Sequence, residues 1–348
     1  MQHQRPLIFR QRRDAYAVLV SEFMLQQTTV PVVERYFPRF MQALPTLRDL
    51  ADAPENAVIG LWAGLGYYRR ARQLHAAAIA IRDNHHGEIP SDPAILEALP
   101  GIGRYTAGAI ASQAFNRPAP ILEANTVRVF ARLAGFDGVV GEGRFMKQLW
   151  QVAEELVTSA GTPAIFNMAA MELGGVICRP VPACDVCPVA EWCRARMAGV
   201  AAAIPRIAPR APVVAVDVIC LILRNSKGKY FVRHIPAGNW HAGLWEFPTQ
   251  RLAVPAKAGE VLEAARTFLA EFAIDQRADL VVLEPLKYSV TKHRVQLHPF
   301  FADVNISDSK PPAGMQILDL PQIWNLPMGS AQKKLLKVIM EMETARDD

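Results

Sequence analysis

The chain has five cysteines among 348 residues, no apolar run of membrane-spanning length, and no low-complexity tract or clear internal repeat. The missing apolar run excludes a helical membrane protein, and the missing repeat excludes a solenoid or propeller. An apolar segment of the secretory type is also missing. We therefore expect a cytoplasmic protein whose cysteines stay reduced, which makes a disulfide pair an unfavoured alternative.

The composition is that of a soluble globular chain with room for two domains. Hydrophobic residues make up 51% and charged residues 20% of the chain, and a length of this kind usually divides into more than one core. The formal net charge of +5 permits nucleic-acid binding without establishing it. Each of two basic groups is either a solvated face or a phosphate contact: Arg5, Arg10, Arg12 and Arg13, and then Arg69, Arg70 and Arg72.

The composition and residue pattern of the sequence change once along the chain. Residues 1–199 are rich in Ala, Leu and Arg between Pro and Gly breaks, which predicts an all-helical region. Residues 200–212 carry separated prolines without amphipathic period, as in an extended linker. Residues 213–345 then predict an α/β domain. Its expected helix is Glu260–Phe272, and its expected strands include Val213–Leu223, Tyr230–His234, Leu280–Leu286 and Val295–Val304.

Four cysteines fall inside sixteen residues, with the spacing C-x5-C-x2-C-x5-C: Cys178, Cys184, Cys187 and Cys193. Thiolates gathered this tightly hold either an iron–sulfur cluster or a structural zinc ion. Zinc sites usually take two CxxC pairs and this segment has one, so we favour the cluster and keep zinc as the alternative. Cys220 stands apart in an apolar run, as a small core residue.

The segment LPGIGRYTAG, residues 99–108, lies between two helical patterns. Gly101 and Gly103 allow a tight hairpin with positive φ and leave backbone N–H groups uncovered. Together with the next helix N-terminus, such groups suit a DNA phosphate. An ordinary helix–helix turn is the alternative, and the cysteine segment some seventy residues later favours the nucleic-acid interpretation.

Two carboxylates stand out. Glu22 lies in the apolar segment VSEFMLQQT, where desolvation raises the pKa of a carboxyl and makes it a proton donor near neutral pH. Glu123 stands at an expected helix start, two residues before Asn125, and helix capping is its alternative role. Two carboxylates on either side of a sugar serve glycosidic cleavage.

Six ordered segments resemble the MutY-type adenine DNA glycosylases of the helix-hairpin-helix superfamily: SEFMLQQT, LWAGLGYYRRARQLH, LPGIGRYTAGAI, FNMAAMELG, the cysteine segment and GLWEFP. The resemblance spans about residues 8–300. It implies a DNA cleft between a six-helix module and a [4Fe–4S] module, followed by a Nudix-like domain that reads the base opposite adenine. The implied partner of this monomer is double-stranded DNA with adenine mispaired to 8-oxoguanine or guanine.

The resemblance also implies residue roles. Glu22 would protonate N7 of the flipped adenine and later help to activate water, while Glu123 and Asn125 support catalysis. Tyr105 stands where lyase-type relatives carry a nucleophilic lysine, so the reaction would stop at the abasic site. Contacts to DNA or to a base are implied at Arg10, Gln27, Tyr67, Gly101, Gly103, Met168, Thr291 and Lys292.

The second domain lacks the metal-binding carboxylates of a Nudix hydrolase around Glu260–Phe272, so recognition is its expected role. Val290, Thr291 and Lys292 take the places of a lesion-inspecting loop. The chain departs from the family pattern at Phe9, Glu123, Ala124 and Met168 (usually Trp, Asp, Gly, and Gln or Glu), and its first cysteine gap is one residue short. The alternatives are therefore a thymine or uracil mismatch glycosylase and a non-cleaving lesion-binding protein.

Overall fold

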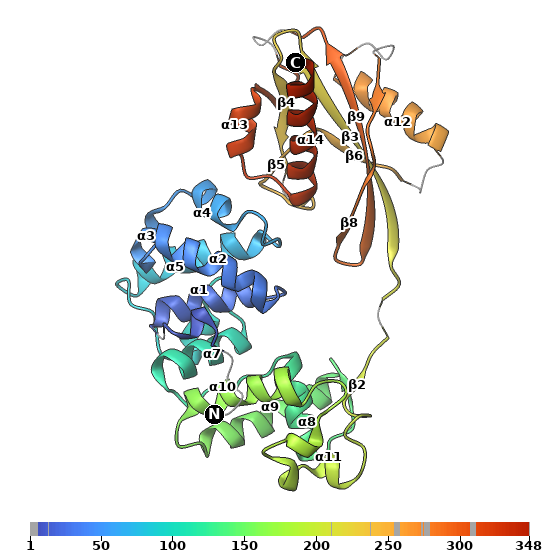
Figure 1. Ribbon diagram of the computed structural model, residues 1–348. Coiled ribbons are helices and arrows are strands. Elements are labelled where there is room, and N and C mark those ends of the chain that lie inside the picture. The colour runs from blue at the N-terminus through green and yellow to red at the C-terminus, as the bar shows by residue number, and fades with distance from the viewer. Residues whose placement is uncertain are drawn as a thin grey trace. The chain divides into compact units, whose positions relative to one another are not determined.

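The computed structural model describes residues 6–12, 14–209, 211–236, 238–253, 258–272, 274, 279–306 and 311–347. The chain forms two compact units, Met1–Pro209 and Arg210–Asp348, which run from blue to yellow-green and from yellow to red in Figure 1. Among the described residues, no helix is long and apolar enough to cross a membrane.

The first unit is helical, as the sequence predicts. Its α-helices are α1 (Ala15–Leu25), α2 (Val30–Ala43), α3 (Leu47–Asp52), α4 (Glu55–Trp62), α5 (Arg69–Asn84), α6 (Pro93–Glu97), α7 (Arg104–Phe115), α8 (Ala124–Ala134), α9 (Gly143–Thr158), α10 (Pro163–Glu172) and α11 (Arg194–Met197). The unit also contains short 3₁₀ or π-helical turns, which are η1 (Ile8–Arg10), η2 (Leu173–Ile177), η3 (Cys184–Val186) and η4 (Ala190–Trp192).

Helix α1 is buried over nearly its whole circumference. Its N-cap is Asp14, whose side chain accepts a hydrogen bond from the Ala17 N–H at 2.9 Å. Every residue from Tyr16 to Met24 is buried, as expected for a helix that is apolar on all sides. Any charged side chain on this helix therefore lies inside the unit.

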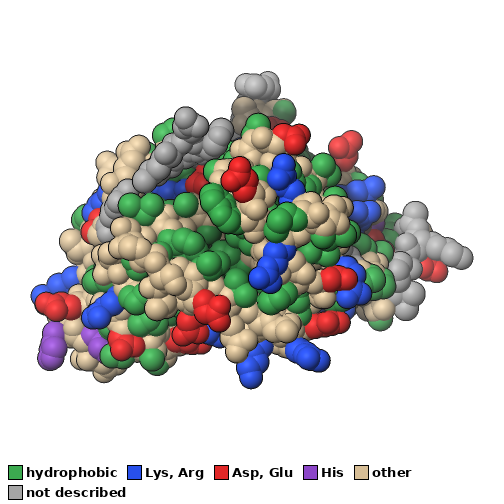
Figure 2. Space-filling view, turned by 90° about the horizontal axis from the view of Figure 1, so that it is seen from below, with side chains coloured by type: hydrophobic (Ala, Val, Ile, Leu, Met, Phe, Trp, Pro, Cys, Tyr) green, Lys and Arg blue, Asp and Glu red, His purple; other side chains and the backbone are tan. Residues whose placement is uncertain are grey.

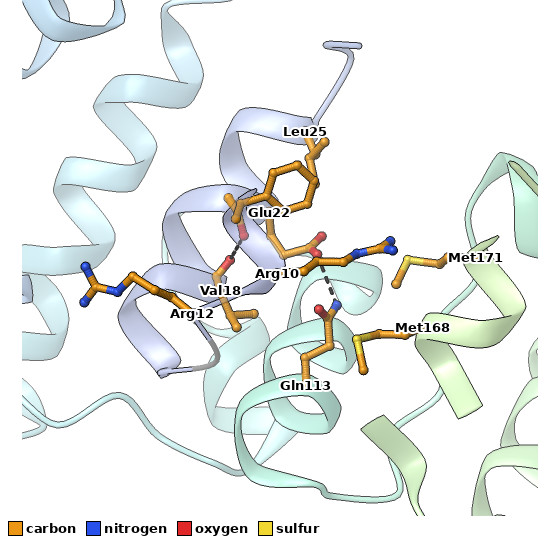
Figure 3. Close-up of a pocket in the computed structure, with 10 residues that line it drawn as sticks. Arg10, Arg12, Val18, Glu22, Leu25, Gln113, Met168 and Met171 are labelled. Carbon is orange, nitrogen blue, oxygen red and sulfur yellow. Dashed lines mark hydrogen bonds between the residues drawn. The ribbon is translucent and has the colours of Figure 1, made fainter. Parts of the chain in front are cut away.

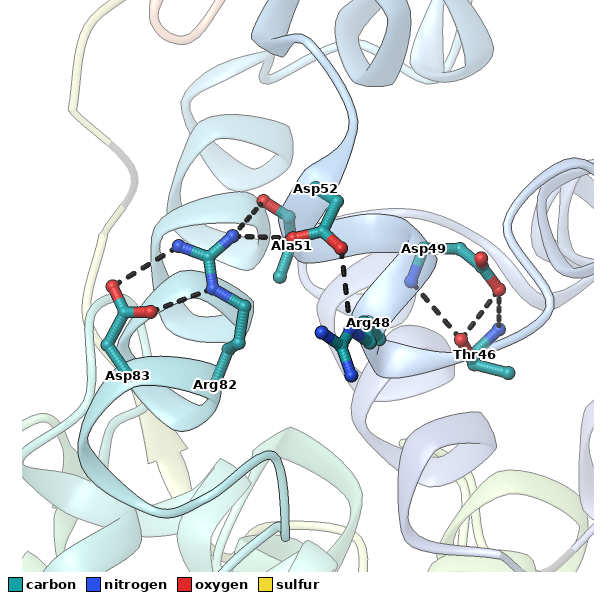
Figure 4. A network of polar contacts seen from close by, with 7 residues as sticks. All are labelled: Thr46, Arg48, Asp49, Ala51, Asp52, Arg82 and Asp83. Carbon is teal, nitrogen blue, oxygen red and sulfur yellow. Dashed lines mark hydrogen bonds and ion pairs between the residues drawn. The ribbon is translucent and has the colours of Figure 1, made fainter.

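Polar contacts fix α3 against α5 (Figure 4). Thr46 and Asp49 form a reciprocal capping box at the start of α3. Arg82 of α5 donates to the Ala51 carbonyl at 3.2 Å and pairs with Asp52 at 2.7 Å. Exposed ion pairs contribute little energy each, so these contacts mainly set the orientation of α3.

Part of the predicted linker belongs to the first unit. Strand β2 (Arg206–Ile207) pairs in parallel with β1 (Val139–Val140), and the Arg132 guanidinium donates to the Ile204 carbonyl at 2.9 Å. The two units divide after Pro209.

The second unit is a mixed sheet with helices on both faces (Figure 1). Its strands are β3 (Val214–Asn225), β4 (Tyr230–His234), β5 (Trp245–Glu246), β6 (Thr249–Arg251), β7 (Val281–Val282), β8 (Leu286–Val290), β9 (His293–Val304) and β10 (Met315–Leu318), and its helices are α12 (Ala258–Ala270), α13 (Leu320–Asn325) and α14 (Ser330–Asp347). The strand order is β10-β4-β3-β9-β7, and β3 and β9 are parallel.

Alternation along β3 builds two cores. Cys220 and Ile222 face the cluster that includes Leu336 of α14, while Ile219 and Leu221 face the cluster that includes Phe268 of α12. Cys220 is fully buried, as predicted.

The prediction of one strand over Leu280–Leu286 is wrong. Only Val281–Val282 pairs with β9 there, and β8 begins at Leu286. Pro285 has no N–H to donate to a ladder, so it separates the two strands.

Candidate active site

A pocket in the first unit is bordered by η1, α1, α7 and α10 (Figure 3). The concavity spans about 440 Å³, a figure that includes the open solvent at its mouth. Its lining residues are Phe9, Arg10, Arg12, Val18, Ser21, Glu22, Leu25, Gln113, Met168 and Met171.

Glu22 lies on the buried helix α1 and is 4% exposed. Its Oε1 accepts a hydrogen bond from Gln113 Nε2 at 3.2 Å, while its Oε2 has no hydrogen-bond partner among the described residues. Burial raises the pKa of this carboxyl to about 7, against the lowering effects of Gln113, Tyr105 and Arg10. A substantial fraction of Glu22 is therefore protonated at neutral pH and able to donate a proton.

Tyr105, in the first turn of α7, donates its hydroxyl hydrogen to Met171 Sδ at 3.6 Å. Burial, and then the charge of Glu22, raise the pKa of this phenol well above its usual value. The side chain therefore stays neutral beside Glu22. It has no amine with which to form a Schiff base.

Glu123 caps α8. Its carboxylate accepts from the backbone N–H groups of Asn125 at 3.0 Å and Thr126 at 3.3 Å, so the capping alternative describes its contacts. Its charge still raises the pKa of Glu22. Neither Glu123 nor Asn125 is among the residues that line the Glu22 pocket, and Asn125 Oδ1 accepts instead from Arg128 Nη2 at 3.0 Å.

Arg10 forms an ion pair with Glu172 at the end of α10, and both side chains are largely buried. The sequence analysis missed Glu172, although it lies in the FNMAAMELG segment. Among the other basic residues singled out from the sequence, Arg12 pairs with Asp14 and Arg72 pairs with Glu55. Arg5 and Arg13 lie outside the described residues.

Arg70 is buried, so the prediction of a solvated face or a phosphate contact for the group Arg69, Arg70 and Arg72 is wrong at this residue. The residue is 5% exposed, and its guanidinium donates to the carbonyls of Phe23, Met24 and Gln26 at the end of α1. It also donates to Thr28 Oγ1 at 2.9 Å and to the Gly66 carbonyl at 3.1 Å. One buried cation thus joins the segment after α1 to the segment before α5.

These two segments carry Gln27 and Tyr67. Both side chains are exposed, and both residues adopt left-handed backbone angles, with φ of 55° and 49°. The Arg70 guanidinium lies 5.5 Å from the Tyr67 ring centroid. Non-glycine residues in this conformation cluster at functional sites, and Arg70 holds the two together.

The two glycines of the hairpin differ in their backbone. Gly101 has φ of +75°, and a Cβ there would stand 2.6 Å from the Gln73 side chain and 2.9 Å from Phe23. Gly103 has φ of −94°, caps α7 without a side-chain hydrogen bond and has open space at the Cβ position. Positive φ is thus required at Gly101 alone, whereas Gly103 leaves the α7 N-terminus accessible.

Cys178, Cys184, Cys187 and Cys193 line one cavity, and no cysteine of the chain is in a disulfide. Arg132 donates to Cys178 Sγ at 3.3 Å. Four thiols beside a guanidinium are a donor set that fits a negatively charged thiolate-ligated cluster. Within the described ranges, no three such groups converge closely enough to hold a single metal ion.

Thr291 and Lys292 form the exposed turn between β8 and β9 in the second unit, and Thr291 has φ of 51°. The adjacent His293 ring lies 4.9 Å from the Trp240 ring, and the Arg251 guanidinium lies 3.4 Å from the centroid of the same Trp240 ring. On the face seen in Figure 2, acidic and basic side chains are scattered among hydrophobic ones.

Comparisons with known proteins address both units. Residues 20–155 match the HhH-GPD superfamily of base excision DNA repair proteins, and residues 219–338 match the NUDIX domain. The chain is 45% identical to the Homo sapiens protein named adenine DNA glycosylase over 205 residues, or 56% of this chain and 37% of that protein.

The Arabidopsis thaliana protein of the same name is 34% identical over 309 residues, or 77% of this chain and 49% of that protein. The chain thus spans half or less of the length of these two relatives. Among solved structures, a thermostable thymine-DNA glycosylase is 28% identical with a TM-score of 0.50, over 56% of this chain and 89% of that one.

Proposed function

Because the chain belongs to the MutY-type glycosylases, which join a helix-hairpin-helix base excision repair domain to a NUDIX domain, we propose that it hydrolyses the bond between adenine and deoxyribose in mispaired DNA. The observation that carries the proposal is Glu22, a buried carboxyl with a pKa of about 7 that lines a pocket of the first unit. In this proposal the chain acts as a monomer on double-stranded DNA in the cytoplasm.

The reaction begins when the mispaired adenine leaves the base stack and enters the pocket, at a cost that is lowest for a mismatch. Glu22 donates its proton to N7 of the base, which weakens the bond between C1′ and N9. That bond breaks, the electron pair leaves with adenine, and C1′ gains oxocarbenium character. Water adds to C1′ as the ionised Glu22 accepts its proton. Tyr105 has no amine for further chemistry, so the product is an abasic site.

DNA binding is assigned to the exposed parts of the first unit. Gln27 and Tyr67 wedge into the duplex beside the mispair. Gly101, Gly103 and the α7 N-terminus receive a backbone phosphate, which favours the positive end of a helix. Arg10 borders the pocket with its charge balanced by Glu172, so it orients the site. Glu123 and Asn125, at the start of α8, support catalysis at Glu22.

The four cysteines are assigned to a [4Fe–4S] cluster. The four thiolates would hold the cluster, and a bound cluster would tie together the segment from Cys178 to Cys193, which has few buried apolar residues of its own. Iron and acid-labile sulfide analysis of the purified chain tests this assignment, with about four irons per chain expected. Stoichiometric zinc without iron would contradict it.

The second unit, Arg210–Asp348, is assigned to lesion recognition. Thr291 offers a hydroxyl to 8-oxoguanine, and Lys292 offers a charge to a phosphate. Because β2 pairs with β1, a catalytic fragment should end at Pro209. That fragment should still excise adenine but lose preference for 8-oxoguanine over guanine, about five- to a hundredfold for one base hydrogen bond.

A second candidate is thymine or uracil excision from mismatches. Met168 lines the pocket where the family pattern has an amide or carboxylate, and the solved thymine-DNA glycosylase shares the helical fold.

An excision assay on four duplexes separates the candidates. Single-turnover rates are measured with A opposite 8-oxoguanine, A opposite G, T opposite G and U opposite G, and alkali converts abasic sites into strand breaks. We expect A opposite 8-oxoguanine to react fastest and strand breaks to need alkali. Faster release of T or U would establish the second candidate, and release of no base would establish a binding protein.

A further inference from the structure

Gln113 is a pocket residue that the sequence analysis did not select. It lies near the end of α7, 91 positions from Glu22 in sequence, and both side chains line the same pocket. Figure 3 shows its amide pointing toward the Glu22 carboxyl, with Met168 beside it.

Gln113 differs in chemistry from the other polar residues that line the pocket. Arg10 pairs with Glu172, Arg12 pairs with Asp14, and the Ser21 hydroxyl donates to the Val18 carbonyl at 3.0 Å. Gln113 is the single neutral amide among the ten lining residues. It therefore combines a hydrogen-bond donor and an acceptor without adding charge.

The contact with Glu22 fixes which end of the amide faces the pocket. Gln113 Nε2 donates to Glu22 Oε1 at 3.2 Å, while Glu22 Oε2, which has no partner among the described residues, is left to carry the proton. An amide oxygen has two acceptor positions. Within the part of the chain that the structure describes, no donor to Gln113 Oε1 is found.

We propose that Gln113 determines base specificity: its Oε1 accepts a hydrogen bond from the exocyclic amine of the flipped base while its Nε2 orients the Glu22 carboxyl. This inference rests on the proposed function. A 6-amino purine presents a donor to this oxygen, whereas a 6-oxo purine presents an acceptor, which leaves two oxygens facing each other. Glutamine is a residue type that recognises adenine through its amide.

Met168 and Met171 complete the arrangement. A thioether has no hydrogen to donate and is a weak acceptor, so these side chains pack against the base without reading its edge. The amide on α7 thus supplies the polar contact that the methionine on α10 lacks.

The test compares single-turnover excision of adenine and of hypoxanthine, each opposite 8-oxoguanine, by the full-length chain. Hypoxanthine carries an oxygen in place of the amine and is otherwise matched in shape. In Gln113→Leu, the adenine-to-hypoxanthine rate ratio should fall by about tenfold. Gln151→Leu, an exposed glutamine on α9, is the matched control and should keep the wild-type ratio.

A second readout separates contact with the base from a packing role. Gln113 lowers the pKa of Glu22 together with Tyr105 of α7 and Arg10 of η1, while Glu123 at the start of α8 raises it. In Gln113→Leu, the pH at which excision of adenine declines should therefore move upward, because Glu22 stays protonated to higher pH. Gln113→Leu combined with Met168→Gln returns an amide to the pocket and should recover part of the rate ratio.

An unchanged rate ratio in Gln113→Leu, with normal folding by circular dichroism, overturns the inference while leaving the proposed function intact. A lowered ratio without any change in the pH profile assigns Gln113 to the base alone and overturns its role in orienting Glu22. If the wild-type chain releases no base from either duplex, the proposed function itself fails, and the inference fails with it.

Discussion

Glu22 is the residue on which the proposed chemistry depends, and its burial within α1 has an effect on stability. Its pKa is about 7 in the folded chain, against an ordinary value of 4.5. A carboxyl whose pKa is raised by folding contributes most to stability below its unfolded pKa. That contribution is lost as the pH rises through the folded pKa, because the buried group must then ionise.

Glu22→Gln should therefore stabilise the chain at high pH, because its amide is neutral at every pH. The gain in the free energy of unfolding over wild type should be about 2 kcal/mol larger at pH 8 than at pH 5. Urea denaturation of both proteins at the two pH values measures this difference. A gain that is the same at pH 5 and pH 8 would mean that Glu22 titrates normally.

Local sequence was enough to predict the desolvation of Glu22, since its apolar neighbours belong to the same helix. The contacts of Gln113 and Glu172 were not predictable in this way. They join residues 91 and 162 positions apart, and pairing at such separation depends on how α7 and α10 pack against α1.

At the scale of elements, Arg70 organises the surface that faces the proposed DNA. Its position in the run Arg69, Arg70 and Arg72 suggested a basic patch, because a sequence does not show which arginine of a helix points inward. In the structure, Arg70 satisfies carbonyl groups that α1 leaves unpaired at its C-terminus. The buried guanidinium thus sets the spacing of Gln27 and Tyr67.

Arg70→Lys should destabilise the chain and weaken its binding to mispaired DNA. An ammonium group cannot reach the carbonyls on both segments, and each buried acceptor left unpaired costs about 1–3 kcal/mol. Arg69→Lys, at the exposed neighbouring position, should change neither property. Thermal melts and fluorescence-anisotropy titrations of a mismatched duplex provide the comparison. Wild-type affinity of Arg70→Lys for the mismatched duplex would show that other contacts position the segments that carry Gln27 and Tyr67.

The elements of the second unit were predictable where an apolar run was continuous. The run from Val213 to Leu223 gave a strand within two residues of the observed β3, because both of its faces are buried. The segment around Pro285 was not, since the apolar residues on either side of the proline pair with β9 at separate places.

At the scale of the whole molecule, the change in sequence texture near residue 200 located two units of different fold class. The contact between β2 and β1 could not be foreseen, because two-residue strands carry almost no periodic signal. The modest net charge of +5 agrees with the proposed DNA recognition, which uses a few side chains such as Gln27 and Tyr67 and the N-terminus of α7.

The most direct test of the central claim is single-turnover adenine release from DNA containing A opposite 8-oxoguanine, measured for the full-length chain and for Glu22→Gln. Glutamine keeps the shape of the side chain but has no acidic proton for N7. The wild-type chain should release adenine, whereas Glu22→Gln should bind the same duplex with similar affinity and release at least about a hundredfold less. Comparable release by the two proteins would contradict the assignment of Glu22 as the proton donor.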